Sequence, residues 1–349
     1  MRMCKIKTEE DKILKLLSDP DIRNSHLMGI GEVQILESKL ADYYQKEYVI
    51  PFPNATSAIW ALIIALNIKR ERILTSPFGW GGALAPFLFS NNIITFIETD
   101  ECCNILPSAV FKEDSKRLLV FSQDFGGFPT QTERLKEILN KKNGLLISDA
   151  SQSFGAFYSG KPAGYFADII ILSFTSQKKV TCFEGGAIIT DRKDIYESIT
   201  RYSQHPYRQK IHLGLQNYNE FAPINGRIHP LAAWILNKTF EYQLENLKTE
   251  QNKYYKMYLQ LVEESIIKPI PQLEMTSNST FFEFLVRLNP KSQSSSRKLN
   301  SQFKDFSFSD KTLIPFFLRK DFMRSFGKKI RIHSYNAKAQ KLIKVKLNN

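Results

Sequence analysis

Short apolar runs that alternate with helix-like segments constrain the fold of this chain most strongly. Such runs, bounded by turn residues, are typical of buried strands. They occupy residues 73–75, 93–97, 118–121, 145–147 and 169–174. A helix-like stretch at 132–139 separates the third run from the fourth. Strands that alternate with helices in this way predict an α/β fold with a central, mostly parallel sheet covered on both faces.

Polar residues follow two of the predicted strands. The run at 145–147 continues into Ser148 and Asp149, and the run at 169–174 is followed by Lys178. Ligands of such sheets bind beyond the carboxyl ends of the strands. A lysine amine in an apolar pocket can stay partly neutral and form a Schiff base with an aldehyde cofactor. An aspartate opposite the ring nitrogen of pyridoxal phosphate (PLP) keeps that nitrogen protonated, so the pair indicates a PLP site.

The residues around these strand ends resemble motifs of the DegT/DnrJ/StrS family of PLP-dependent sugar aminotransferases. The matching blocks, in the family's order and spacing, are Ser148-Asp149-Ala150-Ser151-Gln152, Ser173-Phe174, Lys178 and Glu184-Gly185-Gly186. The resemblance covers most of residues 25–347. It implies a fold-type I PLP transferase, similar to aspartate aminotransferase, with a smaller C-terminal α+β lobe.

The resemblance also implies a role for each matched residue. Asp149 would pair with the pyridine nitrogen of the cofactor, and Gln152 would contact the ring hydroxyl. Ser173 would bind the phosphate, and Lys178 would carry the cofactor. Lys179 is a rival for that last role, but the spacing from Ser173 favours Lys178.

A small-residue turn, Asn54-Ala55-Thr56-Ser57, precedes an apolar helix-like segment. The start of a helix offers backbone N–H groups and a positive dipole end to a phosphate. The resemblance implies that Thr56 and Ser57 hold the cofactor phosphate, although Ala55 replaces the usual glycine. The alternative is an ordinary helix cap by Asn54 or Thr56.

Three further positions follow from the resemblance. Trp80 would stack on the cofactor ring, while the alternative is a tryptophan that fills the core; Gly79 before it replaces the usual threonine. Asn225 would reach the cofactor phosphate of a neighbouring subunit, and Arg227 beside it would contact an anionic substrate. We therefore expect a homodimer with shared active sites. Asp124 stands where the family commonly has histidine.

The chain is strongly basic, with 48 Lys plus Arg against 35 Asp plus Glu and a net charge of +13. This charge suits nucleic acid, a membrane surface or an anionic small substrate, but no nucleic-acid motif accompanies it. The basic residues between 319 and 346 form either a solvated lobe or a surface that attracts a phosphorylated substrate. Without a long apolar run or an apolar signal core, we expect a cytoplasmic protein without membrane insertion.

The cysteines, at positions 4, 102, 103 and 182, show neither zinc spacing nor a disulfide framework. We therefore expect reduced thiols and no metal.

A leading helix is predicted at 8–18, a second helix at 33–44 and a long helix at about 231–261, followed by a strand at 281–288. The predicted domains are a large PLP-binding domain at 1–235 and a small C-terminal domain at 236–349, which is shorter than usual for the family.

The expected function is transfer of an amino group from an amino acid, with glutamate as the expected donor, to a keto-sugar that is often nucleotide-linked in this family. Alternatives are transfer to a keto-cyclitol, a PLP-binding regulatory protein without turnover, and a basic nucleic-acid binder. A sugar-dehydrating branch of the family resembles the chain less, because it carries histidine where Lys178 stands.

Overall fold

The computed structural model describes residue 18 and residues 28–114, 118–274, 278–292, 294–332 and 340–348. The predicted leading helix at 8–18 lies outside this range except for its last residue. The chain divides into two compact units. Unit 1 comprises Met1–Asn67, Ser173–Gln177 and Thr181–Phe240, and unit 2 comprises Ile68–Leu172, Lys178–Val180 and Glu241–Asn349.

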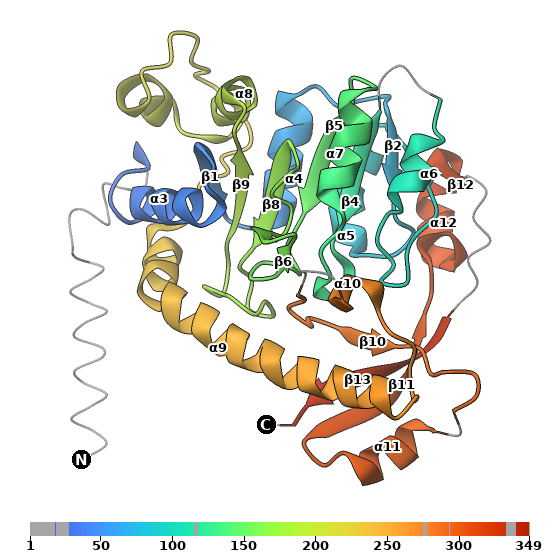
Figure 1. The fold of residues 1–349 in the computed structure, drawn as a ribbon. Coiled ribbons are helices and arrows are strands. Elements are labelled where there is room, and N and C mark those ends of the chain that lie inside the picture. Colours follow the sequence, from blue (N-terminus) through green and yellow to red (C-terminus); the bar gives the residue numbers. More distant parts are fainter. Residues whose placement is uncertain are drawn as a thin grey trace, which may run out of the picture. The chain divides into compact units, whose positions relative to one another are not determined.

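A parallel sheet organises unit 2. Its strands are β2 (Arg72–Thr75), β3 (Ile93–Phe96), β4 (Leu119–Gln123), β5 (Leu145–Asp149), β8 (Ile169–Ser173) and β12 (Ile330–Ile332). The order is β8-β5-β4-β2-β3-β12, and every neighbouring pair is parallel. All positions of β4 and β8 are buried, as expected of strands covered on both faces. The predicted mostly parallel α/β sheet is confirmed (Figure 1).

Helices connect these strands in unit 2. They are α5 (Gly81–Phe89), α6 (Pro107–Phe111) and α7 (Thr132–Asn140). Leu135 and Leu139 of α7 are fully buried and one helical turn apart, while the helix also carries charged residues on its surface. This spacing forms the apolar stripe that holds a helix against a sheet. The helix predicted at 132–139 is confirmed.

A small antiparallel sheet lies in the C-terminal part of unit 2. Its order is β10 (Phe284–Val286), β13 (Gln340–Leu347) and β11 (Phe306–Leu313), and α11 (Ser296–Gln302) packs on β11. The strand predicted at 281–288 is shorter than expected. Its first residues hydrogen-bond elsewhere, since the Glu283 N–H donates to the Gly126 carbonyl at 3.1 Å.

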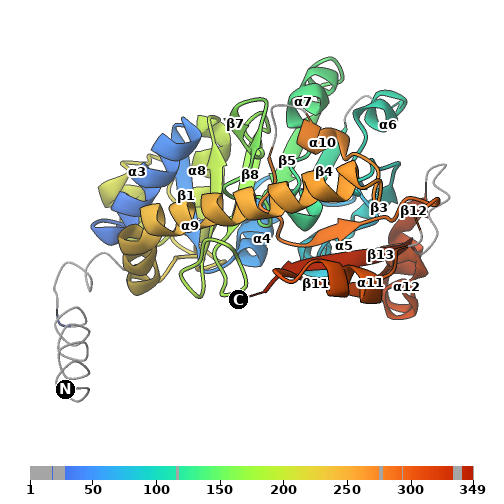
Figure 2. The same ribbon diagram turned by 60° about the horizontal axis from the view of Figure 1, so that its bottom comes forward.

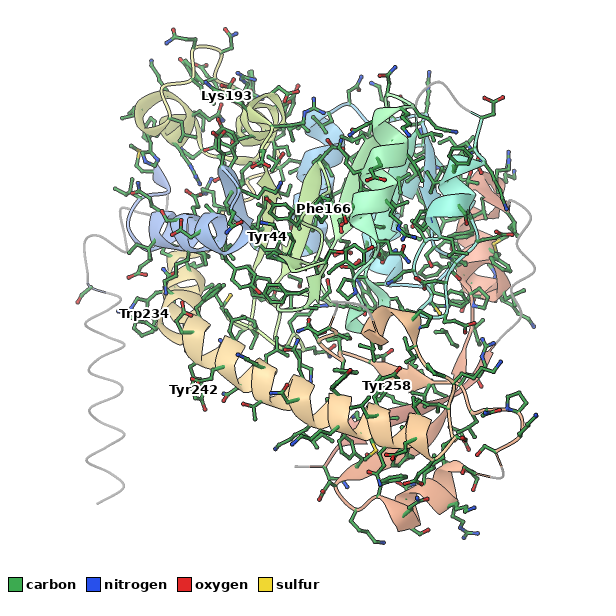
Figure 3. All side chains as sticks on the ribbon, in the orientation of Figure 1. Tyr44, Phe166, Lys193, Trp234, Tyr242 and Tyr258 are labelled. Atoms are coloured by element: carbon green, nitrogen blue, oxygen red, sulfur yellow. The ribbon has the colours of Figure 1, made fainter. Side chains whose placement is uncertain are left out.

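The long helix α9 (Pro230–Glu263) supplies one wall of this small core. In Figures 1 and 2, its C-terminal half runs beside β10, β13 and β11. Tyr254, Tyr258 and Leu261 are buried against apolar residues of all three strands. Figure 3 labels Tyr258 and Tyr242 on this helix, and the Tyr242 side chain is 67 % exposed. The helix is thus apolar on one side and solvated on the other.

Unit 1 contains α3 (Glu32–Tyr44), β1 (Tyr48–Phe52), α4 (Ala55–Ala65), β9 (Gly186–Thr190) and α8 (Lys193–Ser203). Strands β1 and β9 pair in antiparallel register. Val33, Leu36, Leu40 and Tyr44 are the buried residues of α3, so the amphipathic helix predicted at 33–44 is confirmed.

A buried ion pair joins two distant segments of unit 1. Arg208 is 1 % exposed, and its Nη2 donates to Glu37 of α3, while its Nη1 donates to Gln204 Oε1 at 3.0 Å. Gly29 leaves room for this arrangement, because a Cβ there would lie 2.7 Å from the guanidinium carbon. The Gln204 amide in turn donates to the Gly226 carbonyl at 3.3 Å, next to Asn225. Hydrogen bonds through Gln204 therefore connect the Arg208–Glu37 pair to the loop that carries Asn225.

Candidate active site

Within unit 2, Asp149 and Lys178 lie near enough for the charge of each to influence the pKa of the other. Asp149 is the last residue of β5, paired in parallel register with Ile171 of β8, and it is 7 % exposed. Its Oδ1 accepts a hydrogen bond from the Ser151 N–H at 3.1 Å. Burial raises the pKa of Asp149, whereas the Ser151 bond and the nearby Lys178 charge oppose that shift.

Lys178 lies in the loop after β8 and is half-buried. Burial lowers the pKa of its ammonium group, and the Asp149 charge partly offsets this effect. The rival Lys179 differs, because its Nζ donates to Glu250 Oε2 at 2.7 Å and so forms an ion pair. Of the two lysines, Lys178 is therefore better suited to act as a nucleophilic amine.

Trp80 caps the start of α5 and is 67 % exposed, so it does not fill the core. Its backbone N–H donates to Gln123 Oε1 at 3.0 Å. Gly79 permits this bond, because its φ is +147° and a Cβ there would lie 2.6 Å from Gln123 Oε1. Glycine at position 79, where the resemblance implies threonine, therefore allows the backbone conformation in which the Trp80 N–H reaches Gln123.

The turn after β4 meets Gln152. The Gly126 N–H donates to Gln152 Oε1 at 2.9 Å, which fixes the orientation of the side-chain amide. Asp124, at the start of this turn, is 1 % exposed and accepts hydrogen bonds from Ser153 Oγ at 2.5 Å and the Thr130 N–H at 2.9 Å. Burial raises the pKa of Asp124 to about 6. Asp124 therefore ties the turn to the segment after β5.

In unit 1, Asn54 caps α4, because its side chain accepts a hydrogen bond from the Ser57 N–H at 2.9 Å. The helix-cap alternative is correct for Asn54. Thr56 and Ser57 are half-buried in the first turn, where the helix dipole favours an anion. Capping and anion binding are compatible, since a helix start presents several N–H donors.

The other predicted residues of unit 1 lie on two segments. Ser173 ends β8, is 5 % exposed, and its Oγ lies 3.3 Å from Thr175 Oγ1. Asn225 is exposed in the left-handed region, with φ of +49°. Arg227 is half-buried, and its Nε has no hydrogen-bond partner among the described residues. Burial lowers the pKa of Arg227.

Sequence reasoning missed one residue that contacts the candidate nucleophile. Lys178 Nζ lies 4.6 Å from the centre of the Phe282 ring, within unit 2. Phe282 belongs to the apolar run that suggested only a strand. No local pattern links positions more than a hundred residues apart, so only the folded arrangement reveals this contact.

The residues present fit PLP in their chemistry. Unit 2 supplies a buried carboxylate for a ring nitrogen, a half-buried amine of lowered pKa for an aldehyde and an exposed indole for an aromatic ring. Unit 1 supplies hydroxyl groups at a helix start, which suit a phosphate.

No group of three or more His, Cys, Asp or Glu side chains suited to a metal occurs in the described ranges. Within the same ranges no helix is long and apolar enough to cross a bilayer.

Comparisons with known proteins agree with this chemistry. A UDP-4-amino-4,6-dideoxy-N-acetyl-β-L-altrosamine transaminase of Campylobacter jejuni is 29 % identical over 188 residues, which are 53 % of this chain and 50 % of that protein. The chain thus spans about half the length of the curated relatives it matches.

Solved structures show the same fold. The PseC aminotransferase of Helicobacter pylori, involved in the biosynthesis of pseudoaminic acid, has a TM-score of 0.74 and 17 % identity, and the match covers 96 % of this chain and 90 % of that one. A GDP-4-keto-6-deoxy-D-mannose-3-dehydratase of E. coli, solved with bound hydrated PLP, has a TM-score of 0.72 and 18 % identity over 93 % and 92 % of the two chains. At such identity the likeness shows the fold alone.

The profile of a family of PLP-dependent aminotransferases matches residues 10–312, most of the sequence. This chain therefore belongs to the DegT/DnrJ/EryC1/StrS aminotransferase family.

Proposed function

We propose that this protein is a PLP-dependent aminotransferase that moves an amino group from glutamate onto a nucleotide-linked keto-sugar. The observation that carries the proposal is the half-buried Lys178 amine, whose pKa is lowered by burial and whose charge interacts with that of the buried Asp149. A fold shared with a dehydratase leaves the reaction type open, and the lysine at position 178 favours transamination, which needs an amine at that place.

PLP, when bound, supplies an electron sink for the electrons of a breaking Cα–H bond. The negative charge of Asp149 would keep a proton on the ring nitrogen, and Gln152 would contact the ring hydroxyl. Lys178 would hold the cofactor and move a proton to and from the substrate Cα as general base and acid. The Trp80 indole would stack on the ring and exclude water. The hydroxyl groups of Thr56, Ser57 and Ser173 would bind the phosphate.

The proposal includes a homodimer with composite sites. Asn225 is exposed and in the left-handed region, and its loop is anchored by bonds from the Gly226 N–H to the Ser203 carbonyl at 2.8 Å and from Gln204. A fixed, exposed amide is suited to complete the phosphate site of a second copy, and Arg227 beside it to contact an anionic substrate. In a two-fold dimer this contact occurs twice.

Subunit mixing tests the composite site. Lys178→Ala and Asn225→Ala homodimers are each expected to be inactive or nearly so. When equal amounts of the two are dissociated and mixed, about half of all dimers are expected to be heterodimers, and each heterodimer holds one intact site of two. Recovery of turnover supports the proposal, whereas no recovery, or a fully active monomer by sedimentation, contradicts it.

The donor and acceptor are tested directly. The protein is incubated with PLP, glutamate and a panel of UDP-, dTDP- and GDP-linked keto-sugars together with a keto-cyclitol, and 2-oxoglutarate is measured. We expect turnover with one nucleotide-linked sugar. Faster turnover with the keto-cyclitol than with any nucleotide-linked sugar supports the cyclitol alternative. If PLP binds but 2-oxoglutarate is not formed by turnover with any acceptor, the result supports the regulatory alternative. The Lys178→Ala variant is the matched control.

A further inference from the structure

Residues 279–283 are hydrogen-bonded to the turn Gly126-Gly127 within unit 2, and we call this segment the strap. Thr280 N–H donates to the Gly127 carbonyl at 3.1 Å, and Ser279 Oγ donates to the same carbonyl at 2.9 Å. Thr280 Oγ1 donates to the Gln152 carbonyl at 2.5 Å. These bonds fasten the strap to the turn that donates a hydrogen bond to Gln152 and to the segment that carries Gln152.

Close packing leaves the strap little freedom. A Cβ on Gly127, whose φ is +88°, would lie 2.0 Å from Thr280 Oγ1 and 3.0 Å from the Phe282 nitrogen. Ser279 and Thr280 are buried. Position 127 therefore requires glycine for the strap to dock, both for its backbone conformation and for space.

The backbone of the strap turns sharply at Phe281. Phe281 has φ of +50°, a conformation that costs a bulky residue free energy and is retained only when its surroundings impose it. Its ring is 2 % exposed and stacks on Tyr254, with ring centres 5.2 Å apart. With Phe281 held in the core, the next side chain, Phe282, lies against Lys178 Nζ at 4.6 Å from the ring centre.

We infer that Phe282 is a positioning residue, held by the strap, that shields the Lys178 amine from water and confines its approach. The inference rests on the proposed function of Lys178 and adds a residue that neither the motifs nor the comparisons assign. A ring at this distance occupies space that water would otherwise fill beside the amine. It also attracts the charged amine through its face, which opposes the effect of shielding.

Burial lowers the pKa of the Lys178 amine and outweighs the opposing Asp149 charge. The Phe282 ring lies beside this amine and contributes to its burial. The charged residues next to Lys178 and Phe282 in the sequence have ion-pair partners: Lys179 pairs with Glu250 at 2.7 Å, and Glu283 pairs with Lys344 at 2.6 Å. Removing the ring is therefore expected to raise the pKa of Lys178 toward its ordinary value and to make the amine more accessible.

Competitive labelling of lysines measures both effects without turnover. Full-length protein, stripped of cofactor, is treated with trace acetic anhydride between pH 6 and 11, and acetylation of Lys178 is quantified by peptide mass spectrometry. In Phe282→Ala we expect the pH midpoint of Lys178 acetylation to rise by about one unit and the limiting acetylation rate at high pH to rise several-fold. Phe282→Leu, which keeps most of the apolar volume, should fall between wild type and Phe282→Ala and serves if the alanine variant does not fold.

Phe111→Ala is the matched control. Phe111 is 65 % exposed, and Lys142 Nζ lies 5.7 Å from its ring centre. The substitution therefore removes the same type of contact elsewhere in unit 2. It should leave Lys178 labelling unchanged. Equal midpoints and rates at Lys178 in wild type, Phe282→Leu and Phe282→Ala would overturn the inference.

A parallel trapping experiment separates this inference from the proposed function. PLP is added to wild type and the Phe282 variants, and the adduct is reduced with borohydride and mapped. Adduct on Lys178 with unchanged labelling kinetics refutes only the role of Phe282. Absence of adduct from Lys178 in wild type refutes the proposed function, whatever the labelling shows.

Discussion

Removing one charge of the buried Glu37–Arg208 pair should destabilise the protein far more than removing an exposed pair. The Arg208 side chain is 2 % exposed and that of Glu37 is 16 % exposed. Breaking a buried pair by removing one partner costs about 3–5 kcal/mol, because an uncompensated charge stays buried. Glu37→Gln leaves the arginine charged under all conditions, so we expect the full cost of about 3–5 kcal/mol.

Arg208→Met should cost less than Glu37→Gln. Burial already raises the pKa of Glu37, and without the arginine the carboxyl can take up a proton and become neutral. Each pKa unit corresponds to about 1.4 kcal/mol, so a loss of about 1–3 kcal/mol is expected at pH 7. The double variant Glu37→Gln/Arg208→Met buries no charge, so its loss should resemble that of Arg208→Met alone. The coupling free energy then equals the loss in Glu37→Gln, about 3–5 kcal/mol.

Urea unfolding followed by far-UV circular dichroism measures these losses. Arg192→Met is the control, because Arg192 and Asp194 form a 2.6 Å ion pair whose side chains are 48 % and 66 % exposed. That change should alter the unfolding free energy by less than about 1 kcal/mol. Two single variants as stable as wild type, or a double variant whose loss equals the sum of the single losses, would refute the reasoning.

Two further predictions concern buried carboxylates. Asp149→Asn should keep PLP but transfer amine on the order of a thousand-fold more slowly, because a neutral ring nitrogen is a poor electron sink; near wild-type turnover with bound cofactor speaks against the role. Asp124 has its pKa raised from 3.8 to about 6, so between pH 4 and 6 the folded state keeps a proton that the unfolded state loses, and the unfolding free energy falls as pH rises. Asp124→Asn removes this dependence and should be more stable than wild type by up to about 3 kcal/mol at pH 7. An unfolding free energy that changes equally with pH in wild type and in Asp124→Asn between pH 4 and 7 would contradict this prediction.

Local patterns predicted most elements of the fold. The long helix expected at about 231–261 is Pro230–Glu263, and the helix expected at 33–44 is Glu32–Tyr44. These segments carry apolar residues at helical spacing, a local pattern that depends on nothing distant in the chain. The strand expected at 281–288 is shortened to Phe284–Val286, because the Glu283 N–H bonds to Gly126 and Thr280, just before the run, bonds to Gly127. Such a contact has no trace in the local sequence.

The candidate site was predictable where chemistry is carried by neighbouring residues. The spacing from Ser173 selected Lys178, and the Lys179–Glu250 ion pair supplies an independent reason for the same choice. Phe282 was not predictable, since its contact with Lys178 depends on a strap closed by distant hydrogen bonds. The effect of Asp124 on stability could not be predicted from the sequence either, because its pKa is raised by burial in the folded protein. The domain boundary near residue 235 remains a prediction.

Identification of the lysine that binds PLP tests the central claim most directly. The protein is loaded with PLP, reduced with borohydride and digested, and the modified peptide is sequenced by mass spectrometry. We predict a single modified residue, Lys178, with loss of the visible absorbance of bound cofactor in Lys178→Ala and its retention in Lys179→Ala. Modification of Lys179 instead, or no stable adduct on either lysine, would contradict the account.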